Sequence, residues 1–66
     1  MKYRCRLKAI LAERKTNLGI FADRVKISKA ALSLIVNDKS LPSFPVLYRI
    51  CDELDMDFRE IWIKQG

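Results

Sequence analysis

The sequence predicts an all-α fold, a compact bundle of five short helices. The chain has 66 residues, of which 50% are hydrophobic and 32% are charged, a composition typical of one folded domain rather than a disordered tail. Apolar residues recur at helical spacing, and no long segment alternates apolar with polar residues, so no strand is expected. A chain this short buries only about 60% of its unfolded surface, which leaves little room for a walled catalytic cleft.

The first two helices are predicted over about residues 2–14 and 18–25. Lysine and arginine fill one face of the first helix. Its apolar residues, at helical spacing, are Tyr3, Leu7, Ile10 and Leu11. The apolar face of the second helix consists of Phe21, Ala22 and Val25. Asn17 precedes the second helix and is a good N-cap, because its side-chain oxygen can accept a hydrogen bond from a free backbone N–H.

A third helix is predicted over about residues 29–36, with Ser28 as its N-cap. Leu32 and Ile35 form its inner face. Only residues 26–28 separate it from the second helix. The chain must therefore turn sharply between the two helices, and the helices must cross.

The chain then passes through the turn-forming residues 37–43 into a fourth helix. Ser43 can cap this helix, and Pro45 falls in its first turn, where a missing N–H costs little. Its apolar stripe consists of Leu47, Ile50, Cys51 and Leu54. After a further break, Asp57 can cap a short fifth helix. The apolar residues of this last helix are Phe58, Ile61 and Trp62.

Positive charge is concentrated in the first part of the chain. The whole chain carries +5, but residues 1–40 hold ten Lys and Arg against three Asp and Glu, whereas residues 41–66 hold three against five. The first part therefore favours a polyanion such as nucleic acid, and the second part does not. A basic surface that is only solvated is the alternative.

Several chemistries are not expected. The chain has no histidine, the commonest general base and metal ligand. Cys5 and Cys51 lack partners at metal-ligand spacing and are interpreted as small buried hydrophobic residues. We expect no enzymatic activity, metal, cofactor or small-molecule ligand. No apolar run reaches the roughly 18 residues of a membrane span, and the N-terminus has no apolar leader, so we expect a cytoplasmic protein.

Two short helices joined by a three-residue turn, within a basic bundle, are typical of a helix-turn-helix unit, here at about residues 18–37. The motif needs a small residue where its helices cross, a position that Ala22 occupies. It also needs branched apolar residues on the inner face of its second helix, which Leu32 and Ile35 supply. An α-helix fits the major groove of B-DNA, so this arrangement favours binding to duplex DNA.

At this point the sequence resembles a known family, the phage-repressor and Cro-type helix-turn-helix domains, also called xenobiotic-response-element regulators. The segments that carry the resemblance are residues 22–29 (ADRVKISK), 32–39 (LSLIVNDK), 42–43 (PS), 47–54 (LYRICDEL) and 57–62 (DFREIW). No gap is needed across them. The resemblance implies one lambda-repressor-like DNA-binding domain over residues 1–66.

The resemblance also implies a function. It indicates a sequence-specific regulator of transcription, a repressor, that binds double-stranded DNA with the helix at about residues 29–36 in the major groove. By the family's pattern, its base-reading positions correspond to Lys29, Ala30 and Leu34. The full set of DNA-binding candidates is Leu18, Ser28, Lys29, Ala30, Ser33, Leu34, Asn37 and Lys39.

Three departures from the family's pattern bear on this function. Leu18 stands where the family usually has a DNA-contacting Gln, and Lys26 and Asp38 stand where it has Gly. Among the three base-reading positions only Lys29 can donate to a guanine edge, since Ala30 and Leu34 can contact thymine methyl groups but cannot hydrogen-bond. An alternative is therefore a protein-interaction module of the same fold that no longer reads bases, such as an antirepressor or a subunit of a larger regulator.

A weak homodimer is also expected. One recognition helix covers only about 4–5 base pairs, and a two-fold dimer doubles that, with half-sites about 34 Å apart. The apolar C-terminal end is the expected contact, through Phe58, Ile61, Trp62 and Ile63. Burial in the core is the alternative for Trp62.

Overall fold

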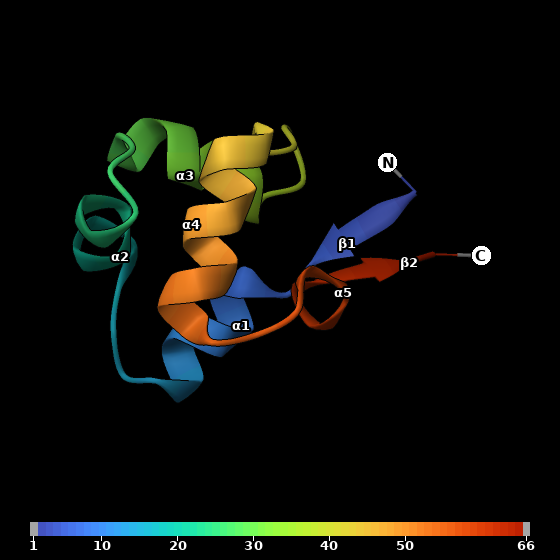
Figure 1. The fold of residues 1–66 in the computed structure, drawn as a ribbon, viewed down its shortest axis with the longest axis horizontal. Helices are drawn as coiled ribbons and strands as arrows, with labels where there is room; N and C mark the ends of the chain where they lie inside the picture. The colour runs from blue at the N-terminus through green and yellow to red at the C-terminus, as the bar shows by residue number, and fades with distance from the viewer. Residues whose placement is uncertain (1, 66) are drawn as a thin grey trace.

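The computed structural model describes residues 2–65, which form five helices and two short strands (Figure 1). In chain order the elements are β1 (Tyr3–Cys5), α1 (Leu7–Glu13), α2 (Leu18–Arg24), α3 (Lys29–Val36), α4 (Phe44–Leu54), α5 (Phe58–Ile61) and β2 (Trp62–Lys64). The helices surround one core, and the two strands extend from it side by side. Within the described residues, no helix is long and apolar enough to cross a membrane.

The two strands correct the prediction of an all-α fold. β1 and β2 pair antiparallel, with Tyr3 opposite Lys64 and Cys5 opposite Trp62. The first helix therefore begins at Leu7 rather than near residue 2, and Tyr3 lies 43% exposed on a strand. The strand was missed because its hydrogen-bonding partner comes from the other end of the chain, whereas periodicity reports only local neighbours.

Three of the four predicted N-caps are confirmed. Asn17 Oδ1 accepts a hydrogen bond from the backbone N–H of Ile20 at 2.9 Å, and Ser28 Oγ accepts one from that of Ala31 at 3.0 Å. Asp57 caps α5 in a reciprocal capping box. Ser43 occupies the N-cap position of α4, but its side chain makes no capping hydrogen bond in the described part of the chain.

The cap of α5 is sensitive to acid. The backbone N–H of Arg59, and then its guanidinium, lower the pKa of the Asp57 carboxyl. A carboxyl whose pKa is lowered by folding stabilises the fold above its unfolded-state pKa, and that contribution disappears as pH falls through the folded-state pKa.

The core lies between α1, α2, α3 and the inner side of α4. The largest fully buried side chains are Leu7, Val25, Leu32, Ile50 and Ile61. Each helix thus supplies apolar side chains from one face, as the periodicity predicts. Arginine side chains join the ends of the elements: Arg14 donates to the carbonyl of Leu54 at 2.8 Å, and Arg49 donates to that of Val25 at 2.8 Å.

Asp38 links the end of α3 to the strand pair. Its backbone has φ 60°, in the left-handed region where the family has Gly, and its Oδ1 accepts a hydrogen bond from the N–H of Cys5 at 2.8 Å. A left-handed backbone costs most side chains about 1–2 kcal/mol, but Asp and Asn are tolerated there. The Asp38 side chain therefore accepts a tertiary hydrogen bond that Gly, which has no side chain, could not accept.

We expect Asp38→Ala to lower the free energy of unfolding by roughly 2–3 kcal/mol, because it removes an acceptor and strains the backbone. Asp38→Asn keeps the oxygen and tolerates the backbone, so it should cost less than about 1 kcal/mol. Urea unfolding followed by circular dichroism measures both changes. Equal losses in the two variants would show that the carboxylate charge, rather than the acceptor, stabilises the link.

Candidate nucleic-acid interface

α2 and α3 are joined by a tight turn and cross at a buried alanine. Lys26 has φ 61°, the left-handed conformation that the family's Gly at this position implies. The N–H of Ile27 donates to the carbonyl of Ala22 at 3.0 Å, which closes the turn. Ala22 is 2% exposed, so a larger side chain at this crossing would force the helices apart. This is the geometry expected of a helix-turn-helix unit.

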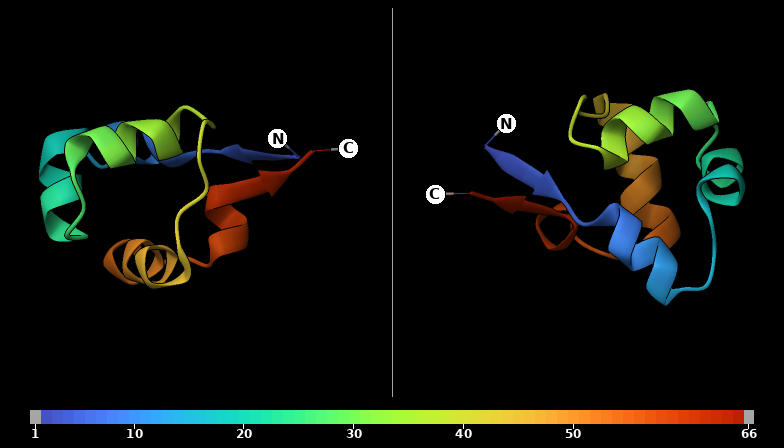
Figure 2. Two further views of the ribbon diagram at one scale, coloured as in Figure 1. Left: turned by 90° about the horizontal axis from the view of Figure 1, so that it is seen from above. Right: turned by 180° about the vertical axis from the view of Figure 1, so that it is seen from behind.

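One face of α3 is exposed to solvent. Leu32, Ile35 and Val36 are buried, and the opposite face points outward. The residues of that outer face are Lys29, Ala30, Ser33, Leu34 and Asn37, all exposed except the half-buried Ser33. α3 and α4 lie on opposite sides of the molecule when it is seen from above (Figure 2). The outer face is therefore open to a large ligand along its whole length.

The polar groups at the two ends of α3 keep hydrogen-bonding capacity for a ligand. Ser28 Oγ accepts the capping bond from Ala31 N–H, and its own O–H remains a donor. The amide nitrogen of Asn37 donates to the carbonyl of Ser33 at 2.8 Å and to its Oγ at 3.4 Å. Lys29 and Lys39 are exposed at the start of α3 and just beyond its end. Cations and donors thus flank an apolar centre, Ala30 and Leu34.

A basic hollow adjoins the C-terminal end of α3. Arg4, Arg6 and Lys8 line it together with Asn37 and Asp38. Arg6 also donates to the carbonyl of Glu60 at 3.4 Å. The charge count predicts that the first part of the chain is basic. It does not predict where the basic hollow lies, because that depends on β1 lying beside the end of α3. These three cations extend the basic surface well beyond the residues predicted from the family pattern.

Leu18 differs from the other predicted DNA-binding residues. It is half-buried and packs against the core. The family's Gln at this position is polar, whereas this leucine stabilises the start of α2 by burial. Leu18 therefore contributes to packing, and its DNA contact stays a prediction.

The residues expected to form a dimer contact are divided by the fold. Ile61 is fully buried and Trp62 is 8% exposed, so both belong to the chain's own core. For Trp62, burial in the core is the alternative to a dimer contact. Phe58 is 50% exposed and Ile63 is half-buried. These two line an apolar hollow of about 580 Å³ with Tyr3, Leu41, Pro42, Leu47, Arg59, Trp62 and Lys64.

Both cysteines are free; Cys5 is buried, as the sequence predicts, whereas Cys51 is half-buried. Burial raises the pKa of the Cys5 thiol, and partial burial raises that of the Cys51 thiol. The thiolate is the reactive form, so a raised pKa makes both thiols poor nucleophiles near neutral pH. Within residues 2–65, no three His, Cys, Asp or Glu side chains come together as a metal site.

The model of a family described as a Cro/C1-type helix-turn-helix DNA-binding domain matches residues 6–63. The match spans all five helices and includes both the helix-turn-helix unit and the basic hollow's Arg6 and Lys8. A search of curated proteins finds no significant match.

Proposed function

Because the chain belongs to the Cro/C1-type helix-turn-helix DNA-binding family, we propose that it is a sequence-specific transcriptional repressor that inserts α3 into the major groove of duplex DNA. The observation that carries this proposal is the uncovered face of α3 with cations at both ends. A helix placed in the groove needs such a face, and the flanking phosphates need such cations. We expect it to act in the cytoplasm without catalytic chemistry.

Each exposed residue of α3 has a role in this proposal. Lys29 donates to a guanine edge, while Ala30 and Leu34 contact thymine methyl groups. Ser33 lies at the rim of the groove, and Ser28 donates its hydroxyl to a phosphate. Beyond the helix, phosphates are bound by Asn37 and Lys39 and by the basic hollow of Arg4, Arg6 and Lys8.

Lys29→Ala should cost about 1–3 kcal/mol of binding to the preferred site and relax the choice of one base pair. Lys39→Ala should weaken binding to all sequences alike and flatten the log–log salt slope by about 1. Selection of duplexes from a random pool, followed by fluorescence anisotropy on the selected site and on a random duplex, separates these outcomes. If the two variants behave identically on both duplexes, Lys29 does not read a base.

We further propose that the repressor binds a palindromic site as a homodimer. The contact is the apolar hollow that Phe58 and Ile63 line, on the acidic part of the chain. A small patch supports only a weak dimer, so pairing occurs mainly on DNA.

Leu41→Ser combined with Ile63→Thr tests this contact, because Leu41 is 55% exposed and threonine keeps the β-branching of the strand. We expect cooperative binding to a palindrome to be lost, while binding to an isolated half-site is retained. Circular dichroism serves as the folding control. Undiminished cooperativity in the folded variant would rule out this hollow as the dimer contact.

A further inference from the structure

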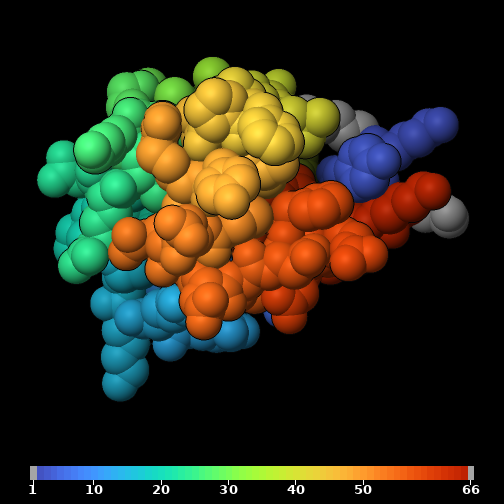
Figure 3. Space-filling view, viewed as in Figure 1, coloured from blue at the N-terminus to red at the C-terminus, as the bar shows by residue number. Residues whose placement is uncertain are grey.

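α4 carries a second apolar face that the fold leaves uncovered. Its inner face buries Ile50 and Leu54. On another face, Phe44 is 75% exposed and Tyr48 is 65% exposed, one helical turn apart, with their ring centroids separated by 6.3 Å. Exposing two large aromatic side chains next to each other is unfavourable unless something covers them. Figure 3 shows α4 and α5 together at the centre of this face of the molecule.

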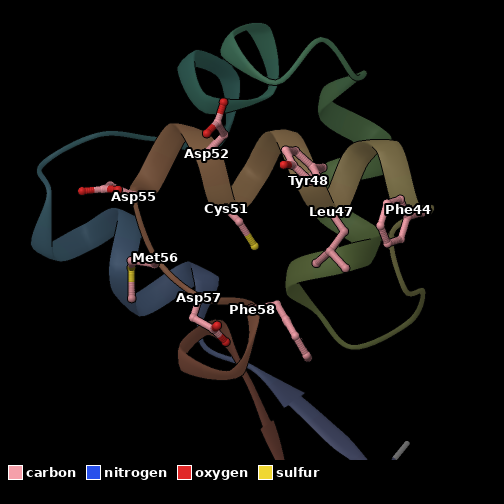
Figure 4. A pocket seen from close by; sticks show the side chains of 9 residues that line it. All are labelled: Phe44, Leu47, Tyr48, Cys51, Asp52, Asp55, Met56, Asp57 and Phe58. Atoms are coloured by element: carbon pink, nitrogen blue, oxygen red, sulfur yellow. The ribbon is translucent and has the colours of Figure 1, made fainter.

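These aromatic residues border a groove between α4 and α5. Leu47 and Cys51 point from α4 into the space between the two helices, and Phe58 borders it on the α5 side (Figure 4). Leu47 and Cys51 are half-buried against the core, as is Met56. The groove encloses about 590 Å³, within the range of sites that hold compact ligands or side chains.

The rim of the groove is acidic, although the chain carries +5. Asp52, Asp55 and Asp57 line it, and no lysine or arginine does. Asp57 is paired with Arg59 at 3.2 Å. Among residues 2–65, Asp52 and Asp55 form no ion pair. A partner that presents cations beside an apolar surface would therefore match both features of the groove.

We propose that this groove binds a cationic amphipathic helix of a partner protein. A helix laid along α4 fills the groove with apolar side chains and places lysine or arginine against Asp52 and Asp55. The 11 residues of α4 span roughly 16 Å, which matches about three turns of a partner helix. This inference goes beyond the DNA-binding proposal and does not depend on it.

Other occupants fit the groove less well. A second copy docked by two-fold symmetry would bring carboxylates against carboxylates. Most of its own cations lie in residues 1–40, and Arg4, Arg6 and Lys8 line the basic hollow beside the surface proposed for DNA. Nucleic acid and anionic membranes are repelled by the rim. Because α3 and α4 lie on opposite sides of the molecule (Figure 2), the partner helix leaves the outer face of α3 free for DNA. It would compete with the proposed dimer contact, because Leu47 and Phe58 line both hollows.

The probe is a synthetic helical peptide of about 14 residues, built of leucine and lysine with leucines along one face. Titrated into the ¹⁵N-labelled full chain, it should produce saturable amide shifts confined to α4, α5 and residues 55–57. A peptide with glutamate in place of lysine should not bind. Shifts spread over the whole surface, or equal binding of both peptides, would overturn the proposal.

Matched variants test the two features separately. Phe44→Ala with Tyr48→Ala should weaken peptide binding by about tenfold or more, and Asp52→Asn with Asp55→Asn should weaken it and reduce its salt dependence. Ile20→Ala and Glu13→Gln change exposed residues outside the groove and should leave binding unchanged. All these positions are exposed, so the variants should fold, as circular dichroism would check.

Two further measurements distinguish the alternatives. The Phe44→Ala, Tyr48→Ala variant should bind DNA as tightly as the parent does. Because peptide binding is measured separately, a failure of the DNA proposal would not change how the peptide result is interpreted. Sedimentation of the same variant reports on self-association. If the parent dimerises and this variant is monomeric, the occupant is a second copy and the proposal is wrong.

Discussion

Trp62→Ala should unfold much of the protein. Trp62 is 8% exposed, and truncating a buried tryptophan typically costs about 3–5 kcal/mol. A 66-residue domain has a total stability of only about 3–10 kcal/mol. Cys5, opposite Trp62 in the strand pair, would also lose part of its covering. The variant is therefore a test of the core and cannot serve as a clean probe of dimerisation.

Urea unfolding measures this effect. Trp62 is the only tryptophan, so the variant must be followed by far-ultraviolet circular dichroism rather than by fluorescence. Phe58→Ala is the control, because Phe58 is 50% exposed and its truncation removes less buried area. If Trp62→Ala loses less than about 1 kcal/mol, the tryptophan does not contribute to the core as its burial indicates.

The second large effect is the dependence of DNA affinity on salt. Four to six phosphate contacts give a log–log slope of roughly −4 to −6, so affinity should fall roughly 250- to 4,000-fold between 50 and 200 mM salt. The cations assigned to these phosphates are those around α3: Lys39, Arg4, Arg6 and Lys8. Fluorescence anisotropy of a labelled duplex at several salt concentrations gives the slope.

A pair of lysine variants locates the contact surface. Lys8→Gln, in the basic hollow, should reduce the magnitude of the slope by about 1. Lys15→Gln removes the same charge from the exposed turn between α1 and α2, outside both the basic hollow and the hollow of Phe58 and Ile63, and should leave the slope unchanged. A slope near zero in the parent would exclude DNA and favour the alternative of a protein-interaction module that does not read bases.

The helical part of the fold could be predicted because its signals are local. The spacing of Leu32 and Ile35 predicts the buried face of α3, and Asn17 and Ser28 predict where α2 and α3 begin. A helix is made of hydrogen bonds and contacts between residues three or four apart, so the sequence around each residue is enough. The DNA-binding roles on the outer face of α3 come instead from the resemblance to the family, and they stay predictions.

The strand pair and the use of particular side chains were decided by tertiary structure. β1 exists because the other end of the chain supplies its partner, and Trp62 is a core residue because that pairing places it against the other helices. Leu18 is half-buried against the core, which its position in the family's pattern does not indicate. None of these outcomes depends on near neighbours in sequence.

By itself, the sequence determined the order of the helices, their caps, the helix-turn-helix unit and the excess of positive charge in residues 1–40. Only the tertiary structure decided where that charge acts: Arg14 is tied to a backbone carbonyl of α4, while Arg4 and Lys8 line a hollow beside the end of α3. It also decided that α4 has an uncovered aromatic face. The physical reason is that charge and hydrophobicity are properties of single residues, whereas a surface is formed by residues that the fold brings together.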